Sequence, residues 1–349
     1  MEDITFSDAF TYHNIRTAAK DCTDGVKWKP SVQNFIINNL QWSANLYKQI
    51  HTHTYKSKGF YEFWLLERGK MRFIQSVHIS ERTVQKCLNN YGVRPLTEPR
   101  LIYDNGASRK GKGTEFAIKR LRRHLASHYR RHGLKGGVLV LDIHDYFNSI
   151  HHSKLLPMMR KAIADDELYE QAKYFIDAFG DMGLGLGSEL SQIAAIYYPS
   201  GLDHFIKEKL HIKGYGRYMD DMYLIHEDVT YLKHCMHEIE KELHNLGLEL
   251  NAKVQIVRFD KGESFHFMKR RFKLTDTGKV LTRLERQNIT KRRRVIKRQH
   301  VAYMDGRANI ESIRQSYQAW RGYALKWDSY HTVLNMDRLF HKTFGKDVA

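Results

Sequence analysis

The chain has 349 residues, and its 57 Lys and Arg against 39 Asp and Glu give it a formal net charge of +18. Its 42% of hydrophobic and 12% of aromatic residues exclude intrinsic disorder for most of its length, and its 3 cysteines exclude a disulfide scaffold. No stretch approaches the roughly 18 to 20 apolar residues that span a bilayer. We therefore expect a basic, cytoplasmic protein that contacts no membrane and binds a polyanion.

The first clear element along the chain is a hairpin. Residues 60–76, FYEFWLLERGKMRFIQS, contain two β-rich stretches on either side of a Glu-Arg-Gly-Lys turn, in which Gly69 supplies a permissive backbone. Residues 138–143, VLVLDI, then predict a buried strand, because the run is short, apolar and rich in β-branched residues. Asp142 interrupts this run near its end, so its carboxylate requires an explanation.

The next part of the chain predicts an acidic hairpin followed by a helix and a strand. Residues 214–226, GYGRYMDDMYLIH, place Asp220 and Asp221 in a tight turn between two β-prone stretches. Residues 231–246 have apolar side chains near helical spacing, and residues 248–257 alternate as a strand. This order of elements predicts an α+β fold, in which helices cover one face of an antiparallel sheet.

Three aspartates stand where a strand and a neighbouring turn can bring them together. Asp142, Asp220 and Asp221 would repel one another unless cations lie between them. Two Mg²⁺ ions about 4 Å apart suit such a cluster, because hard cations prefer oxygen ligands and a pair of them supports nucleotidyl transfer. The alternative is an ordinary turn at residues 220–221 and a helix cap at Asp142.

The residues around these aspartates favour the metal interpretation. Tyr218-Met219-Asp220-Asp221 is the YxDD signature of reverse transcriptases, and LDIHDYFNSI at residues 141–150 resembles the first palm motif of that family. GLGLGSELSQ at residues 183–192 resembles the second motif, and GLELNAK at residues 247–253 resembles the fourth. With four motifs in the family's order, the chain is identified as a member of the reverse transcriptase family.

The resemblance implies a right-hand polymerase. Residues 1–59 would form an N-terminal helical extension, residues 60–135 the fingers, residues 136–284 the palm and residues 285–349 a helical thumb. The last segment is too short for an RNase H or endonuclease domain, so we expect neither activity from it.

The same resemblance assigns roles at the catalytic centre. Asp142, Asp220 and Asp221 would hold two Mg²⁺ ions, with Mn²⁺ as an alternative, and the backbone carbonyl of Ile143 would be a further ligand. Lys253 matches a motif lysine that protonates pyrophosphate as it leaves, although a solvated surface lysine is the alternative.

Further residues are assigned to the incoming nucleotide. Phe147, five residues after Asp142, matches the steric gate that packs where a ribose 2′-OH would lie, so the expected substrate is a deoxynucleotide. Lys70 and Arg72 on the hairpin, with Arg82 beyond it, are candidates for binding the triphosphate. For Lys70, as for Lys253, a solvated surface lysine is the alternative.

The second motif departs from the common pattern. Many reverse transcriptases have Pro-Gln-Gly where this chain has Gly185-Leu186-Gly187, followed by Ser191-Gln192. Leu186 and Gln192 would lie at the nucleotide, where a leucine lacks the amide that glutamine provides. Altered fidelity is one expectation, and a leucine that serves only for packing is the alternative. The pattern resembles diversity-generating retroelements and phage-borne or antiphage-defence reverse transcriptases. A second departure is Phe267-Met268-Lys269 in the primer-grip hairpin, where Leu-Gly is usual.

Two basic runs, at residues 120–131 and 291–298, supply candidate contacts to nucleic acid, although a charged run is often only a solvated helix face. The candidates are Arg120, Arg122, Arg123, Arg130, Arg131, Lys291, Arg292, Arg293, Arg294, Lys297 and Arg298. His124 and His128 share a helix face in the first run, and we expect them to accompany its arginines on the surface.

Two other clusters favour structure over chemistry. His234, Cys235 and His237 lie within about one helical turn and lack a second cluster, which disfavours zinc. Trp320 and Trp327 are expected in the core of the thumb rather than as stacking platforms for bases.

The sequence thus predicts an RNA-directed DNA polymerase that extends a DNA primer with dNTPs. The first biological interpretation is a bacterial or phage retroelement or antiphage-defence enzyme that copies a dedicated structured RNA. The second is a diversity-generating polymerase that needs a small basic accessory protein or an oligomeric assembly. A different class is a catalytically idle, maturase-like RNA-binding relative, and the intact aspartates argue against it.

Overall fold

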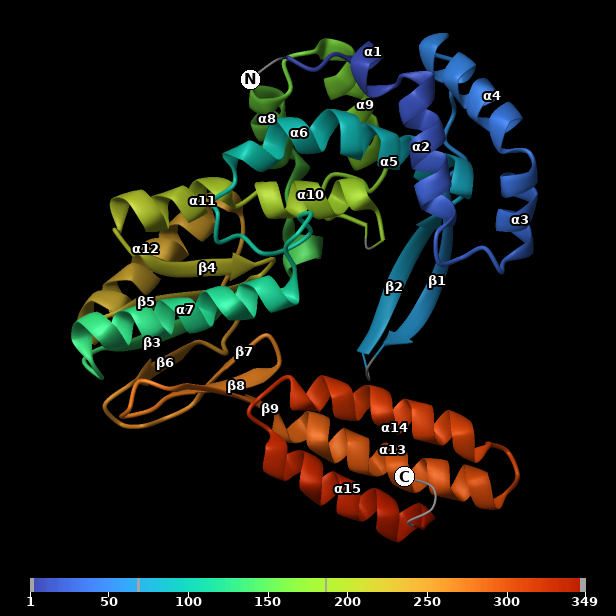
Figure 1. The fold of residues 1–349 in the computed structure, drawn as a ribbon. Helices are drawn as coiled ribbons and strands as arrows, with labels where there is room; N and C mark the ends of the chain where they lie inside the picture. The colour runs from blue at the N-terminus through green and yellow to red at the C-terminus, as the bar shows by residue number, and fades with distance from the viewer. Residues whose placement is uncertain (1–2, 68–69, 186, 346–349) are drawn as a thin grey trace. The chain divides into compact units, whose positions relative to one another are not determined.

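The computed structural model describes residues 3–67, 70–185 and 187–345. The chain divides into two compact units, whose elements are labelled in Figure 1. Unit 1 comprises the chain up to Ile118, Asp142–Met222 and His234–Lys253, and unit 2 comprises Lys119–Leu141, Tyr223–Lys233 and the chain from Val254. Among the described residues, no helix has the length and apolar character needed to cross a membrane.

Helices and strands are mixed along the chain, which confirms the α+β class. The helices are α1 Phe6–Ala9, α2 Tyr12–Thr23, α3 Pro30–Ile37, α4 Asn39–His51, α5 Ile79–Leu88, α6 Arg94–Thr97, α7 Thr114–His132, α8 His152–Ala162, α9 Asp166–Asp177, α10 Glu189–Tyr197, α11 Ser200–His204, α12 Val229–Leu246, α13 Arg286–Met304, α14 Ile310–Leu325 and α15 Tyr330–Phe344. The strands are β1 Phe60–Glu67, β2 Lys70–Val77, β3 Gly137–Asp142, β4 Gly214–Tyr218, β5 Asp221–His226, β6 Gln255–Arg258, β7 Phe265–Phe267, β8 Arg270–Leu274 and β9 Val280–Leu284.

Unit 1 begins with helices and a hairpin. The side chains of Thr5 and Thr11 cap α1 and α2 by accepting backbone N–H groups, and α2 packs on α4 and α5 through apolar residues such as Ile15. β1 and β2 pair antiparallel, from Phe60 opposite Val77 to Glu67 opposite Lys70, which confirms the predicted hairpin. Arg68 and Gly69 at its tip lie outside the described residues.

A four-stranded sheet has the strand order β4-β5-β3-β6. β4 and β5 are the two arms of the predicted acidic hairpin, and β3 is the predicted apolar strand, buried along residues 137–141. β3 pairs antiparallel with β6, with Gly137 opposite Arg258. α12 confirms the helix predicted at residues 231–246.

The strand predicted at residues 248–257 is wrong over its first seven residues, since β6 begins only at Gln255. Before it, Leu250 makes an isolated bridge with Ile143, and the backbone N–H of Asn251 donates to the carbonyl of Asp142 at 2.7 Å. The Asn251 side chain then accepts the N–H of Lys253 at 3.3 Å, which turns the chain out of the ladder.

Unit 2 contains a three-stranded antiparallel sheet, β7-β8-β9, and a bundle of α13, α14 and α15. The bundle core consists of Ile296, Ile313, Tyr317, Met336 and Phe340. Trp320 packs on this core, and Trp327 packs on the neighbouring cluster around Val333. Both tryptophans therefore have the core role predicted for them.

Candidate active site

The acidic hairpin turns over two residues, Met219 and Asp220, between the end of β4 and the start of β5. Met219 has a left-handed backbone with φ of 56°. A residue with a Cβ pays roughly 1 kcal/mol or more for this conformation, so other contacts must hold the turn.

The backbone holds Asp142 and Asp220 in register. The N–H of Ile143, the residue after Asp142, donates to the carbonyl of Asp220 at 3.3 Å. On its other side Asp142 is tied to Asn251, whose backbone N–H and side-chain amide donate to the Asp142 carbonyl and carboxylate at 2.7 and 3.1 Å. One backbone hydrogen bond of 3.3 Å thus joins the first motif to the YMDD turn, and the fourth motif supports the first.

The two carboxyl groups affect each other's ionisation. Burial raises the pKa of Asp220, and the adjacent Asp142 raises it further through its charge and a side-chain hydrogen bond. Two carboxylates that share one position behave in this way until a cation neutralises them. Asp221 follows directly as the first residue of β5 and is partly exposed.

The acidic pair fits a divalent cation by its chemistry. Asp142 and Asp220 offer carboxylate oxygens, the ligands that a hard ion prefers. Within the described part of the chain, no group of three or more His, Cys, Asp or Glu side chains is arranged to hold a metal. The structure therefore brings Asp142 and Asp220 together and leaves the third carboxylate of the predicted set, Asp221, outside such a group.

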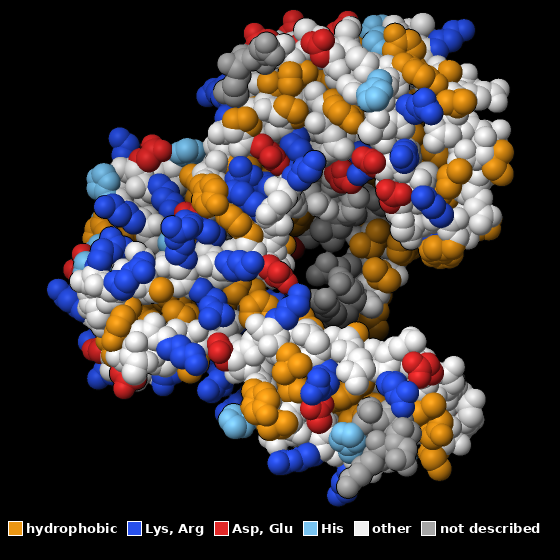
Figure 2. Space-filling view, in the orientation of Figure 1, with side chains coloured by type: hydrophobic (Ala, Val, Ile, Leu, Met, Phe, Trp, Pro, Cys, Tyr) orange, Lys and Arg blue, Asp and Glu red, His pale blue; other side chains and the backbone are white. Residues whose placement is uncertain are grey.

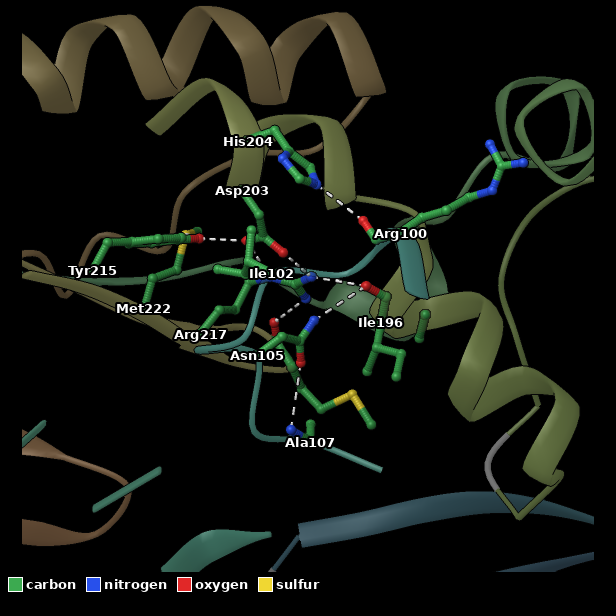
Figure 3. A network of polar contacts seen from close by, with 12 residues as sticks. Arg100, Ile102, Asn105, Ala107, Ile196, Asp203, His204, Tyr215, Arg217 and Met222 are labelled. Atoms are coloured by element: carbon green, nitrogen blue, oxygen red, sulfur yellow. Dashed lines mark hydrogen bonds and ion pairs between the residues drawn. The ribbon is translucent and has the colours of Figure 1, made fainter. Parts of the chain in front are cut away.

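A buried ion pair beneath the turn escaped the sequence interpretation (Figure 3). Arg217 on β4 is 1% exposed and Asp203 on α11 is 0% exposed, and the Arg217 Nη2 lies 2.7 Å from an Asp203 carboxylate oxygen. Although burial lowers the pKa of an arginine, the Asp203 carboxylate raises that of Arg217 and keeps it charged. A cation inside the β-prone run GYGRY was the available signal, because a buried arginine requires a carboxylate partner.

The residues predicted at the nucleotide have different environments. Phe147 is half-buried, packs edge-on against the buried Tyr146 at 5.8 Å, and accepts the N–H of Leu184 at its carbonyl at 2.8 Å. Gln192 accepts a hydrogen bond from the Ser108 hydroxyl at 3.0 Å. Arg82 and Lys253 are exposed. Leu186 and the side chains of Lys70 and Arg72 lie outside the part of the chain that the structure describes.

The glycine before Leu186 has a steric reason. A Cβ at Gly185 would lie 2.0 Å from the ring of Phe179, which stacks on Phe60 with ring centres 5.0 Å apart. Because the Phe179 ring fills the space beside Gly185, a proline or any other residue with a Cβ would clash there unless the ring moved. This ring is a structural reason for the departure from Pro-Gln-Gly.

The two basic runs form helices, and most of their predicted contact residues reach the surface. On α13, Lys291, Arg293, Arg294, Lys297 and Arg298 are exposed. On α7, Arg123, Arg130 and Arg131 are exposed, and Arg120 and Arg122 are partly exposed. Lys and Arg side chains are denser than acidic ones on the surface around α7 (Figure 2).

Two residues of these runs correct the prediction. Arg292 is buried, donates to the Ser316 hydroxyl at 3.2 Å and lies over the ring of Tyr317 at 5.5 Å, so it belongs to the bundle interior. His128 is also buried, donating to the Lys135 carbonyl at 2.7 Å, and burial lowers its pKa. Both side chains point inward because helical spacing places them on the apolar face. His124 remains partly exposed and bonds to the Tyr223 hydroxyl at 3.0 Å.

The fold, with its acidic turn on an antiparallel sheet, is that of a right-hand polymerase. The sequence model of the family described as reverse transcriptase (RNA-dependent DNA polymerase) matches residues 55–268, which is more than half of the chain. The chain belongs to the reverse transcriptase family, whose members use divalent metal ions. Comparison with curated protein sequences gave no significant match.

Solved structures with a similar fold include two telomerases. One is the telomerase of Candida albicans in complex with the TWJ fragment of telomeric RNA, with 14% identity, a TM-score of 0.49, and 64% of this chain and 46% of that chain covered. The other is the apo telomerase of Candida tropicalis truncated from its C-terminal domain, with 14% identity, a TM-score of 0.49, and 63% and 54% covered. This chain spans about half the length of each.

Proposed function

We propose that this chain is an RNA-directed DNA polymerase that joins deoxynucleotides to a primer 3′-OH. The observation that carries the proposal is the YMDD turn, which sets Asp220 beside Asp142 in the oxygen-rich arrangement described above. Asp142, Asp220, Asp221 and the carbonyl of Ile143 would hold two Mg²⁺ ions. Such ions, when bound, favour the ionised primer hydroxyl and stabilise charge on the leaving pyrophosphate.

The chain's own side chains would bind and orient the substrates. Phe147, half-buried on Tyr146, would exclude the 2′-OH of a ribonucleotide. Arg82, together with the hairpin residues Lys70 and Arg72, would neutralise the triphosphate, and Leu186 and Gln192 would lie next to the base. Lys253 would give a proton to the leaving pyrophosphate.

The same proposal assigns the parts of the hand. The helices before residue 60 would be an N-terminal extension, and the β1–β2 hairpin with the segment to residue 135 would be the fingers. Residues 136–284, with both antiparallel sheets, would be the palm, and the bundle of α13–α15 within residues 285–349 would be the thumb. The exposed arginines and lysines of α7 and α13 would contact the phosphates of template and primer.

The second motif supports a bacterial or phage retroelement or antiphage-defence enzyme that copies a dedicated RNA. The supporting feature is Gly185-Leu186-Gly187 followed by Ser191-Gln192, with Phe179 filling the space beside Gly185. The same pattern supports a second candidate, a diversity-generating polymerase with a basic accessory protein.

Primer extension on poly(rA)/oligo(dT) with Mg²⁺, with Asp220→Asn as the inactive control, tests the activity. Extension by the native chain but not by the Asp220→Asn variant supports the proposal. Tight RNA binding without extension supports the idle, maturase-like alternative. Sequencing the RNA and identifying the proteins that co-purify then separates the two biological roles, since a small basic partner protein is expected only for the second.

A further inference from the structure

Arg217 is fixed in direction by its partners (Figure 3). Its Nε and Nη2 donate to the two carboxylate oxygens of Asp203 at 2.8 and 2.7 Å, and the Tyr215 hydroxyl donates to the same carboxylate at 2.6 Å. A bidentate pair between a planar guanidinium and a carboxylate fixes orientation as well as distance. Because both charged residues are almost completely buried, solvent does not loosen this geometry.

The remaining N–H groups of Arg217 reach two backbone carbonyls. Nη2 donates to the carbonyl of Ile196 at the end of α10 at 2.8 Å, and Nη1 donates to the carbonyl of Met219 at 3.0 Å. The Arg217 backbone is fixed as well, since its N–H donates to the Asp104 carbonyl at 3.1 Å and its carbonyl accepts the Gly106 N–H at 3.0 Å. Arg217 therefore ties the turn to three other segments of unit 1.

The Met219 carbonyl belongs to the peptide that precedes Asp220, and the Asp220 carbonyl belongs to the peptide that follows it. Arg217 holds the first of these peptides, and the Ile143 N–H holds the second at 3.3 Å. With both flanking peptide planes fixed, the backbone of Asp220 has little freedom, although Met219 keeps its left-handed φ of 56°.

We propose that Arg217 is a positioning residue for Asp220: its ion pair with Asp203 holds the Met219 carbonyl, and this aims the Asp220 carboxylate at Asp142 for cation binding. The inference rests on the proposed function. Asp203 neutralises Arg217, so the pair orients the turn without supplying the positive charge that the acidic residues require.

A purely stabilising role for Arg217 is the competing explanation, and three variants separate the two. Arg217→Lys keeps the charge but cannot bind Asp203 through two nitrogens and also reach the Met219 carbonyl. Tyr215→Phe removes only the hydroxyl that orients Asp203. Tyr198→Phe is the matched control, because its hydroxyl donates to the Leu246 carbonyl in the same unit and does not contact the turn.

The measurements are Mn²⁺ binding by electron paramagnetic resonance without nucleotide, kcat and KM for dTTP on poly(rA)/oligo(dT), primer–template affinity, and the melting temperature. For Arg217→Lys we expect kcat to fall on the order of 100-fold with KM and primer–template affinity nearly unchanged, since displacement of a reacting group by about 1 Å has such an effect. Mn²⁺ binding that is sensitive to Asp220→Asn should weaken about fivefold or more. Tyr215→Phe should shift both quantities in the same direction by a smaller factor, and Tyr198→Phe should shift neither.

Arg217→Lys and Tyr215→Phe variants that melt earlier but keep native kcat and Mn²⁺ affinity well below their melting temperatures would overturn the inference. If Arg217→Lys does not fold, Tyr215→Phe decides alone by the same criteria. If the native chain binds Mn²⁺ but extends no primer, the proposed function fails, and the Mn²⁺ affinities still decide whether Arg217 positions the turn.

Discussion

Two hairpin turns, one in each unit, contain non-glycine residues with a left-handed backbone, one such residue in the first turn and two in the second. The β4–β5 turn has Met219 at φ 56°, and the β7–β8 turn has Met268 and Lys269 at φ 48° and 60°, where glycine or asparagine is usual. In each, a neighbouring buried arginine donates to a carbonyl of the turn: Arg217 to Met219 at 3.0 Å and Arg270 to Met268 at 3.1 Å.

The two arginines are oriented by different partners. Arg217 is gripped by the Asp203 carboxylate, whereas Arg270 lies 4.3 Å over the ring of Trp327 and donates to the Tyr323 hydroxyl at 2.8 Å. A bidentate ion pair fixes direction more strictly than stacking on a ring, which tolerates sliding. Arg217, with the bidentate ion pair, contacts the turn that carries carboxylates. Arg270, stacked on Trp327, links the turn that carries Lys269 to the helical bundle.

Removing charge from each turn should give the largest difference in activity between the two. We expect Asp220→Asn or Asp221→Asn to reduce primer extension on the order of 1,000-fold or more, because the charge that would bind the cations is lost. RNA binding and the melting temperature should stay close to native, since neither change removes packing. The matched change in the other turn, Lys269→Gln, should leave most of the activity. Primer extension above a few per cent of native in the aspartate variants would contradict the assignment.

The exposed face of α13 extends the comparison from chemistry to binding. Arg293, Arg294 and Lys297 line a surface hollow with Thr290 and Asn335. Changing the three cations to glutamine should weaken RNA binding roughly 30-fold at low salt. It should also flatten the slope of log K against log salt by about two to three units, because each lost phosphate contact removes about 0.7 to 0.9 of a unit. Fluorescence anisotropy across a salt series measures both.

The control for charge alone is Lys209→Gln with Lys213→Gln in unit 1, which removes exposed cations outside the basic runs. An unchanged salt slope in the α13 variant would make its cations a solvated helix face. A loss of kcat without a loss of affinity would contradict the assignment of these cations to RNA binding.

Sugar selection tests whether side-chain packing at Phe147, a residue of the same proposed active site as the acidic turn, contributes to substrate choice. Phe147 is half-buried on Tyr146, so truncation should open space at the sugar without emptying the core. We expect Phe147→Ala or Phe147→Val to raise use of CTP relative to dCTP by about tenfold or more, equivalent to roughly 1.4 kcal/mol of discrimination. The measurement is kcat/KM for both nucleotides opposite the same template guanine. An unaltered ratio with a lower melting temperature would show that Phe147 serves only for packing.

Local patterns in the sequence predict much of this fold. The hairpins at residues 60–76 and 214–226, the strand at 138–143 and the helix at 231–246 follow from apolar spacing and turn residues, and the structure contains each of them. The strand at 248–257 fails because Asn251 bonds to Asp142, a partner 109 residues away that no local pattern contains. Arg292 and His128 fail for a related reason, since a basic residue inside a charged run gives no sign that its face is buried.

The candidate site divides in the same way. The YMDD motif identifies Asp220 and its neighbours directly, because the residues that act also carry the signature. The Arg217–Asp203 pair is silent in the sequence, since its members are 14 residues apart on a strand and a helix and meet only in the folded chain. Residues that hold a site are therefore harder to predict than residues that act in it.

Relief of backbone strain gives the smallest effect and the finest distinction between the turns. Met268→Asn with Lys269→Gly supplies the residues that a two-residue turn with two positive φ angles favours, so it should stabilise the chain by about 1 kcal/mol and raise the melting temperature by roughly 1–2 °C. Met219→Gly removes a similar penalty at the acidic turn and should also stabilise it. Glycine there also widens the range of backbone angles before Asp220, so kcat should fall severalfold, whereas the Asn-Gly variant should keep native kcat. Calorimetry and single-nucleotide extension measure the two quantities. Equal kcat in both variants would mean that the acidic turn needs no more rigidity than the β7–β8 turn. The difference between the Arg217–Asp203 ion pair and the stacking of Arg270 on Trp327 would then have no functional consequence.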